Sequence, residues 1–326
     1  MARRTWAIVN VVISLAVLAG GLWAFWNIQS IVDWWRLMQY KPAAAIVQLA
    51  NETTMIGRGR DMFYVSDPQI EARDAFNQHC SDHGAGEQGA VLGCYVRQSI
   101  YIFNVNDPRL PGVKEVTAAH EMLHAVYDRL DKPTKDRLNA LLQAEFDKRK
   151  DDADLQEVVA LYQKTEPGEL LNEMHSILAT EYTGLSPELE TYYKQYFTDR
   201  QKVVSYAQGY KQVFKDSKTR VENYQKQLDA LKQQIDTNNA QLKNEYAAIQ
   251  SESLRLDALR HSDPATYNQQ VSAYNARVTA YNNHIKTTQA LVNQYNAIIP
   301  KIKSEVALQA DLNNSLDSNY QPVSPN

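Results

Sequence analysis

The sequence has few cysteines that could form disulfide bonds, and it has no excess of positive charge that would favour binding to nucleic acid. Its 326 residues include only two cysteines, Cys80 and Cys94, which excludes a disulfide framework. Aspartate and glutamate (38) outnumber lysine and arginine (34), and the net charge of −4 argues against a dedicated nucleic-acid binder. Histidine occurs seven times, and the sole glycine after Asp199 is Gly209. The length allows one compact domain with an extended part, or two domains.

Two of the seven histidines stand four residues apart in His120-Glu121-Met122-Leu123-His124. Residues four apart on a helix project from the same face, so both imidazoles can bind one metal ion. The glutamate between them can reach a metal-bound water and remove its proton. This HExxH pattern predicts zinc on His120 and His124, with Glu121 as the general base. The alternative interpretation is a buried amphipathic helix whose histidines face the core.

An uncharged, mostly apolar run covers residues 5–28. At about 1.5 Å per residue it is long enough to cross a bilayer as one helix. The preceding Arg3 and Arg4 favour a cytoplasmic N-terminus. We therefore expect an uncleaved, single-pass signal anchor in the cell membrane, with the catalytic domain outside the cytoplasm. A cleaved signal peptide is the alternative. Residues 31–42, which contain Trp34 and Trp35, are expected along the membrane surface.

Export would place Cys80 and Cys94 in a compartment that permits a disulfide. A disulfide between them and two free thiols are both compatible with the sequence. A metal site built from His79, Cys80 and His83 lacks the paired spacing of structural zinc sites, so we rank it below both.

Helix and strand signals alternate between Pro42 and the histidine motif. They predict, in order, a helix after Pro42, a strand over 61–66, a helix over 68–80, a loop over 83–90, strands over 91–96 and 99–105, and the helix of the motif. This order predicts an α+β fold, in which a small sheet packs against helices.

The same order resembles the N-terminal subdomain of the zincin metallopeptidases, where a sheet precedes the HExxH helix. A second motif, Asn172-Glu173-Met174-His175-Ser176, resembles the NExxS segment of the gluzincin branch, to which thermolysin belongs. The glutamate of that segment is the third zinc ligand, so the resemblance implies Glu173 as a ligand beside His120 and His124. The family often has an aspartate after the serine, where this chain has Ile177.

Two neighbours compete with Glu173 for the third position. His175 would give a three-histidine site, but it projects to roughly the opposite side of the predicted helix. Glu181 lies eight residues further on and about 80° round the helix. This position suits a residue that contacts a metal ligand rather than the metal itself.

The implied reaction is hydrolysis of a peptide bond in a protein or peptide substrate. Zinc lowers the pKa of its bound water and polarises the carbonyl, and Glu121 passes the proton to the leaving amine. A further donor is needed for the oxyanion. The nearest candidates are Tyr182, Tyr192 and Tyr193.

A helical arm is predicted from about Asp199. Its first half repeats an apolar residue every seven positions, at Leu228, Ile235, Leu242, Ile249 and Leu256. A break near Pro264 precedes a second heptad series, at Val271, Val278, Ile285, Val292, Ile299 and Val306, accompanied by a repeated Tyr-Asn pair. Two heptad runs joined by one turn predict an antiparallel helical hairpin, which packs on itself, contacts a partner or forms a homo-oligomer. Pro300 should kink or end the second helix.

The predicted organisation is an anchor and juxtamembrane segment (1–36), a zincin-like metallopeptidase domain (37–198), a coiled-coil hairpin (199–318) and a flexible tail (319–326). The predicted function is a membrane-anchored zinc metallopeptidase. The alternative is a cell-surface coiled-coil interaction protein with an inactive or structural zincin-like domain. Glu121 favours the enzyme, because a structural zinc site does not require a glutamate at that place.

Overall fold

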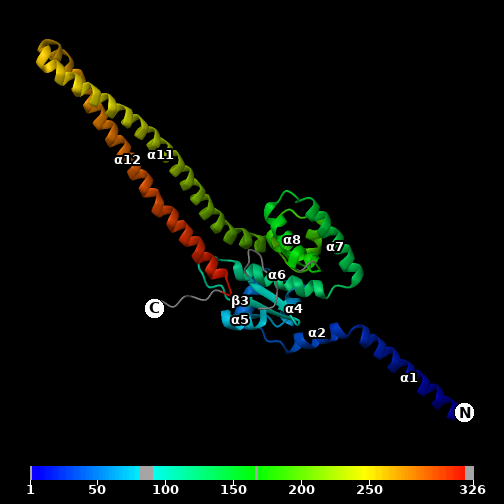
Figure 1. Ribbon diagram of the computed structural model, residues 1–326. Helices are drawn as coiled ribbons and strands as arrows, with labels where there is room; N and C mark the ends of the chain where they lie inside the picture. The colour runs from blue at the N-terminus through cyan, green and yellow to red at the C-terminus, as the bar shows by residue number, and fades with distance from the viewer. Residues whose placement is uncertain (1, 81–90, 166–167, 320–326) are drawn as a thin grey trace. The chain divides into compact units, whose positions relative to one another are not determined.

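The computed structural model describes residues 2–80, 91–165 and 168–319 (Figure 1). In chain order its elements are α1 (Ala2–Trp26), α2 (Ile28–Gln39), α3 (Ala44–Glu52), α4 (Gly57–Val65), β1 (Gln69–Glu71), α5 (Arg73–Cys80), β2 (Gly93–Val96), β3 (Ser99–Phe103), α6 (Val113–Asp128), α7 (Lys132–Asp147), α8 (Ala153–Thr165), α9 (Leu170–Glu181), α10 (Pro187–Tyr193), α11 (Arg200–Ser262) and α12 (Pro264–Leu316).

Helices make up 79% of the structure, and its sheet has three short strands. The predicted α+β zincin-like fold class is therefore wrong, and the fold is mainly helical. Residues 61–66, predicted as a strand, belong to α4, because a short apolar run fits a buried helix as well as a strand. The helix predicted over 68–80 is divided into β1 and α5. The loop predicted over 83–90 lies outside the described residues.

The predicted single transmembrane helix is also wrong. Within the described ranges no single helix is long and apolar enough to cross a membrane. The segments Ile13–Trp26 and Ile28–Gln39 meet that criterion only together, and they are bent by 73° relative to each other. The break falls at Asn27, whose side-chain amide donates to the carbonyl oxygen of Trp23 at 2.8 Å. The backbone N–H of Asn27 donates to the same carbonyl oxygen at 3.1 Å, so the helical hydrogen bonds of α1 continue up to this residue.

The sheet has the strand order β1-β3-β2 and lies against α6. Strand β1 is parallel to β3, with Ile70 opposite Ile102, and β2 is antiparallel to β3, with Gly93 opposite Ile102. The turn between β2 and β3 uses Arg97 and Gln98, both with positive φ angles (50° and 64°). Strand β2 is thus an edge strand, and it contacts the helix that carries the HExxH motif.

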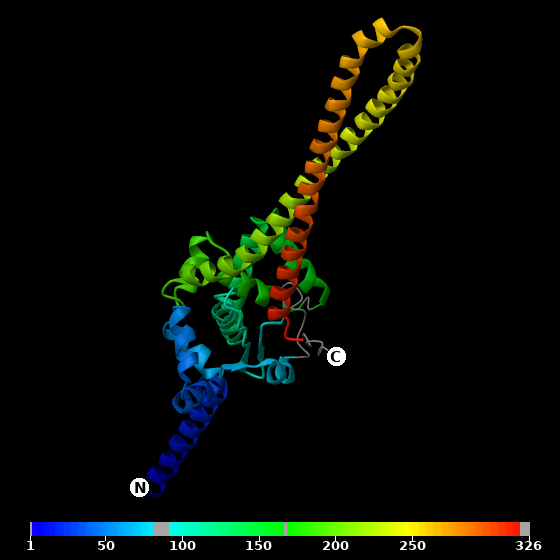
Figure 2. The same ribbon diagram turned by 90° about the vertical axis from the view of Figure 1, so that its left-hand side faces the viewer.

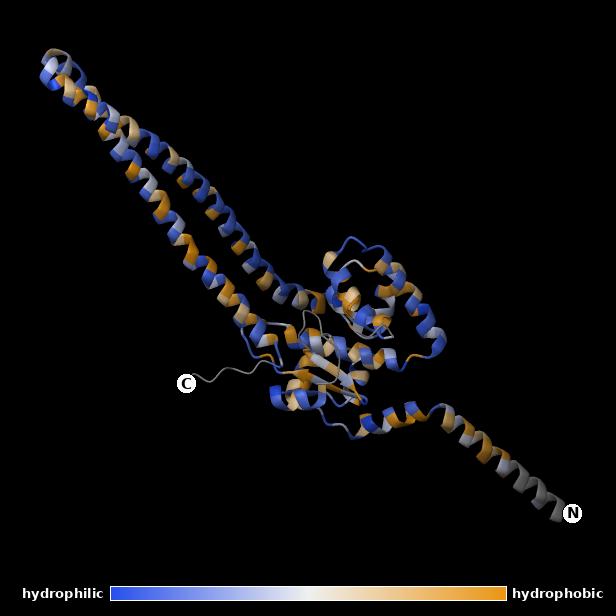
Figure 3. Cartoon of the chain, viewed as in Figure 1, coloured by the Kyte–Doolittle hydropathy of each residue, from blue (hydrophilic) through white to orange (hydrophobic). Residues whose placement is uncertain are grey.

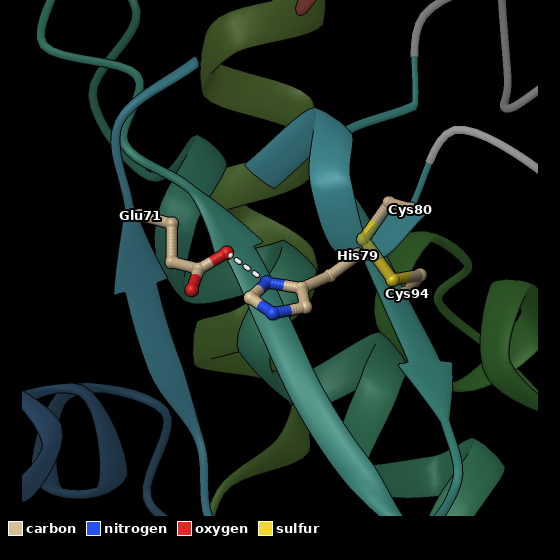
Figure 4. The surroundings of a disulfide bond; sticks show 4 residues. All are labelled: Glu71, His79, Cys80 and Cys94. Atoms are coloured by element: carbon tan, nitrogen blue, oxygen red, sulfur yellow. Dashed lines mark hydrogen bonds and ion pairs between the residues drawn. A yellow bond between two sulfur atoms is a disulfide. The ribbon is translucent and has the colours of Figure 1, made fainter. Parts of the chain in front are cut away.

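A disulfide between Cys80 and Cys94 ties β2 to the end of α5 (Figure 4). Of the two alternatives left by the sequence, a disulfide and two free thiols, the structure shows the disulfide. Cys80 is therefore excluded as a metal ligand. The neighbouring His79 stacks on Tyr101 with 4.1 Å between ring centroids, and its Nδ1 lies 2.9 Å from a carboxylate oxygen of Glu71. His83 lies outside the described residues.

The chain divides into two compact units, residues Met1–Lys211 with Asn313–Asn326, and residues Gln212–Leu312. In the second unit α11 and α12 run side by side in opposite directions and are joined at residues 262–264, as both views show (Figures 1 and 2). Helix α12 continues past Pro300 to Leu316, so Pro300 does not end it.

Polar positions in the seam of this hairpin are matched by polar partners. Asn238 donates to the Thr288 hydroxyl at 3.2 Å, and Glu245 lies 3.1 Å from His284 Nδ1. Glu252 pairs with Arg277. The residues that interrupt the heptads of α11 therefore help to fix its register against α12.

Candidate metal centre

Helix α6 presents the HExxH motif from an almost fully buried position. Its N-terminus begins after Gly112, whose φ of 91° suits glycine, and a Cβ there would lie 2.6 Å from Cβ of Tyr206. Helices α3, α4 and α9 and strands β2 and β3 all contact α6. As predicted from their spacing, the rings of His120 and His124 lie together, with centroids 4.7 Å apart.

The first turn of α9 brings Glu173 to these two imidazoles. One carboxylate oxygen, Oε2, lies 3.4 Å from Nε2 of His120, and Oε1 lies 3.5 Å from Nε2 of His124. One ligand atom from each of the three residues can be chosen so that all lie within 4.8 Å of one another. Three donors at these separations can converge on a single ion.

The electrostatics of Glu173 keep its carboxylate ionised. Burial raises its pKa, but His124, His120 and a hydrogen bond from Tyr162 lower it more, to about 2. The N-terminal turn of α9 also favours a negative charge there. Its Oε2 is buried and has no hydrogen-bond partner among the described residues. A buried, ionised oxygen without a donor fits a metal ligand.

Glu121 is not one of the three donors, but it lies close enough to His124 and Glu173 to interact with both electrostatically. It is 5% exposed, and a Cβ built on Gly93 would lie 2.6 Å from its Oε1. Burial raises the pKa of Glu121 to about 7, while His124 lowers it and Glu173 raises it. A carboxyl group with such a pKa can both accept and release a proton near neutrality.

Asn172 fixes the tautomer of His124. Its side-chain nitrogen donates to Oε2 of Glu169 at 3.0 Å, which orients the amide, because a carboxylate only accepts. Its Oδ1 therefore faces Nδ1 of His124, 3.0 Å away. An amide oxygen also only accepts, so Nδ1 carries the proton and Nε2 presents its lone pair to the site. Asn172 therefore orients the His124 ring, a role for which the sequence had indicated no residue.

The two rivals of Glu173 lie elsewhere. His175 is fully buried among the rings of Tyr127, Tyr192 and Tyr193, and burial lowers its pKa to about 3, with further contributions from His124 and His120. Glu181 forms an ion pair with Lys211. Neither belongs to the group of three donors.

The three tyrosines proposed as oxyanion donors have other contacts. The hydroxyl of Tyr193 donates to the carbonyl oxygen of His175 at 2.8 Å, and that of Tyr192 lies 3.5 Å from the hydroxyl of Tyr196. The ring of Tyr182 lies beneath the guanidinium of Arg149.

Sequence reasoning missed two residues beside the donors. Tyr162 of α8 is buried and hydrogen-bonds to Glu173, and Gly93 of β2 packs against Glu121. Neither stands at a fixed spacing from a motif, so no sequence signal identified them.

Comparisons of the chain with protein-family models, with curated proteins and with solved structures found no match.

Proposed function

We propose that this protein is a zinc-dependent peptidase that hydrolyses peptide bonds, with His120, His124 and Glu173 as the ligands and Glu121 as the general base. The observation that carries the proposal is the approach of Glu173, from a separate helix, to the Nε2 atoms of both histidines. A helix whose histidines merely faced the core would not need an ionised carboxylate between them.

The donor set favours zinc over the other common divalent cations. Two imidazole nitrogens and one carboxylate oxygen are a known ligand set of hydrolytic zinc, and three protein ligands leave a position for water. Magnesium and calcium prefer oxygen ligands throughout, which two imidazoles do not provide. When bound, zinc would supply a Lewis acid that lowers the pKa of a water molecule and polarises the scissile carbonyl.

The residues of the chain have distinct roles in this reaction. The buried Oε1 and Oε2 atoms of Glu121 take a proton from the attacking water and deliver it to the leaving nitrogen. Asn172 holds the proton of His124 on Nδ1, and Tyr162 holds the Glu173 carboxylate in place. General base catalysis of this kind contributes about 10²–10⁴-fold to the rate.

The test compares the wild-type full chain with Glu121→Gln. Zinc per chain is measured by mass spectrometry of the metal, and cleavage by digestion of a peptide library. Wild type should bind one zinc and cleave, and Glu121→Gln should keep the zinc and lose at least about 100-fold in rate. Glu115→Gln, at the start of the same helix, is the matched control and should cleave normally.

Full turnover by Glu121→Gln would refute the mechanism. Failure of the wild type to bind zinc would refute the metal centre. Zinc binding without cleavage of any library peptide would instead favour the alternative function, a coiled-coil interaction protein in which the metal is structural.

A further inference from the structure

All five tryptophans of the chain lie within its first 35 residues, and all are exposed. Trp6, Trp23, Trp26, Trp34 and Trp35 are between 56% and 83% exposed. Tryptophan is highly buried on average in folded domains, so five exposed rings in one segment indicate a surface that binds something. Tryptophan is enriched where a membrane meets water, because its ring is apolar and its N–H is polar.

Helix α2 turns its apolar side away from the rest of the protein. We call its exposed apolar residues the outer face of α2: Ile28, Ile31, Trp34, Trp35 and Met38. They recur at spacings of three and four, which places them on one side of the helix, and they are between 39% and 68% exposed. The half-buried Asp33 and Leu37 lie on the opposite side. An amphipathic helix of a globular protein normally packs its apolar side on the core, so α2 has the reverse arrangement.

A buried ion pair fixes this orientation. Arg129, directly after the HExxH helix α6, donates from Nε to Oδ2 of Asp33 at 2.8 Å and from Nη2 to Oδ1 at 3.2 Å. The two side chains are only 9% and 13% exposed. Nη1 of the same guanidinium donates to the hydroxyl of Tyr95 in β2 at 2.7 Å. A pair with two parallel hydrogen bonds restricts rotation of α2, so its outer face stays turned towards the surroundings.

The apolar surface continues into α1, where it covers every side of the helix. At about 100° per residue, Ile13, Leu15, Trp23 and Phe25 point in four different directions, and each is between 56% and 74% exposed. Figure 3 shows hydrophobic residues along the described part of α1 and, mixed with polar ones, along α2. A protein groove or a second copy of the chain would cover one side of such a helix, whereas lipid covers all of them.

The charge of this segment suits an anionic lipid surface. Residues 1–51 contain four basic residues, Arg3, Arg4, Arg36 and Lys41, against one acidic residue, Asp33, which gives a net charge of +3. The chain as a whole carries −4. Asp33 is paired with Arg129, so its charge does not oppose an anionic surface. Basic residues beside an apolar face are attracted to anionic headgroups.

From these observations we propose that α2 lies on an anionic membrane surface, with its outer face among the lipids and the Asp33–Arg129 pair holding it to the HExxH helix. The bend of 73° between the two segments lets α1 enter the lipid while α2 lies along it. The attachment does not require either helix to cross the bilayer. It is independent of the proposed hydrolysis, because it uses no donor of the metal centre.

A fluorescent label on the full chain tests the contact with lipid. The native cysteines form a disulfide, so one engineered thiol is unique. Met38→Cys is labelled with an environment-sensitive dye and mixed with vesicles of phosphatidylcholine and phosphatidylglycerol, with or without a spin-labelled lipid. The dye should brighten with the vesicles and be quenched by the spin label. Asp154→Cys, an exposed residue of α8, is the matched control and should show neither effect.

The quenching pattern decides the proposal. Absence of quenching at Met38→Cys would overturn the lipid contact. Equal quenching at Asp154→Cys would overturn the orientation, because the chain would then adsorb without a preferred face. Brightening that rises with protein concentration and needs no vesicles would mean that a second copy of the chain covers the outer face, and the proposal would be wrong.

Co-sedimentation with the same vesicles provides a second measurement. In the Trp34→Ser, Trp35→Ser variant the bound fraction should correspond to at least about 10-fold weaker partitioning, because two large apolar side chains leave the lipid. The helical circular dichroism should be unchanged, since both rings are exposed. The matched control, Tyr246→Ser with Leu254→Ser, also removes two exposed large side chains, but from α11, and should bind as wild type does. Unchanged binding by the tryptophan variant would exclude the outer face of α2 as the lipid contact.

The lipid composition tests the role of charge. Wild type should bind vesicles of phosphatidylcholine alone at least about 10-fold more weakly than the anionic vesicles, because the basic residues near α1 and α2 then lose their attraction to the headgroups. Equal binding to both kinds of vesicle would contradict the proposed anionic surface.

Discussion

Gly93 of β2 lies directly against the side chain of Glu121. A Cβ at this glycine would be 2.6 Å from Oε1 and 2.8 Å from Cγ of the glutamate, and 2.5 Å from Cγ2 of Thr117. Real Cβ contacts are longer than this, so any larger residue must displace the proposed general base. The edge strand thereby sets the position of a carboxylate on the neighbouring helix.

Gly93→Ala should therefore impair the proposed reaction without removing the metal. Overpacking of this kind costs about 1–3 kcal/mol of stability, and we expect the cleavage rate to fall at least about 10-fold because Glu121 moves. Zinc content and peptide cleavage are measured together. The matched control is Gly209→Ala in α11, where a Cβ would have no neighbour within 4 Å. That change should raise stability by up to about 1 kcal/mol. Normal cleavage by Gly93→Ala would show that the contact does not position Glu121.

Loss of the Asn172 side chain should weaken zinc binding. In Asn172→Ala the Nδ1–H of His124 loses its acceptor, and the imidazole is free to rotate or to change tautomer. Changes in such orienting groups typically cost about 10–100-fold in metal affinity. The measurement is competition with a chelator. Asn172→Asp keeps an acceptor oxygen at the same place and should retain most of the affinity. An equal loss in both variants would instead point to a general packing defect.

The sequence predicted those features of the structure that depend on residues close together in the chain, and it missed those that depend on contacts between distant segments. The positions of His120 and His124 follow from helical geometry over four residues, and the motif around Glu173 named the group that meets them. The break at Asn27 and the helix at residues 61–66 were missed, because short apolar runs fit several structures and their surroundings decide between them.

The neighbours of the donors depend on contacts between distant segments. Tyr162 reaches Glu173 from α8, and Gly93 reaches Glu121 from β2, at no fixed spacing along the chain. In the hairpin the heptads predicted two paired helices, but they did not predict which members of the valine and isoleucine series stay exposed beside α11. Ile285 and Val306 belong to the heptad series but are 41% and 52% exposed.

Removal of the Cys80–Cys94 disulfide should lower the stability of the compact unit that contains it, residues Met1–Lys211 with Asn313–Asn326, and should also reduce cleavage. The two cysteines are 14 residues apart, and closing a loop of this size stabilises a fold by about 3 kcal/mol in the chain-entropy description. Cys94 follows Gly93 on β2, so a looser strand also loosens the contact with Glu121. We expect the Cys80→Ser, Cys94→Ser variant to match wild type treated with reductant, both in urea unfolding and in cleavage. Unchanged stability after complete reduction would contradict this role.

Asp107 should make stability depend on acid pH. It accepts hydrogen bonds from the backbone N–H and the Nε of Arg109, both at 2.9 Å, and from the hydroxyl of Ser315 at 2.9 Å. The side-chain hydrogen bond from Arg109 contributes most to holding the pKa of Asp107 well below its usual value, against the opposing effect of burial. A group whose pKa is lowered in the folded state stabilises that state above the pKa it has when unfolded. The contribution is lost as the pH falls towards the folded pKa.

The variant Asp107→Asn isolates this effect, because it keeps the shape of the side chain but cannot ionise. Wild type should exceed it by about 1–2 kcal/mol at neutral pH, and the difference should shrink from about pH 4 downwards as the wild-type carboxylate becomes protonated. Urea unfolding followed by circular dichroism between neutral pH and about pH 2.5 measures the difference. Asp136→Asn, at an exposed pair with Lys132, is the control and should change little at any pH, since exposed ion pairs contribute little. A difference that stays the same from neutral to acid pH would mean that Asp107 acts through its shape. Only an ionised carboxylate gains fully from the hydrogen bonds that Arg109 and Ser315 donate.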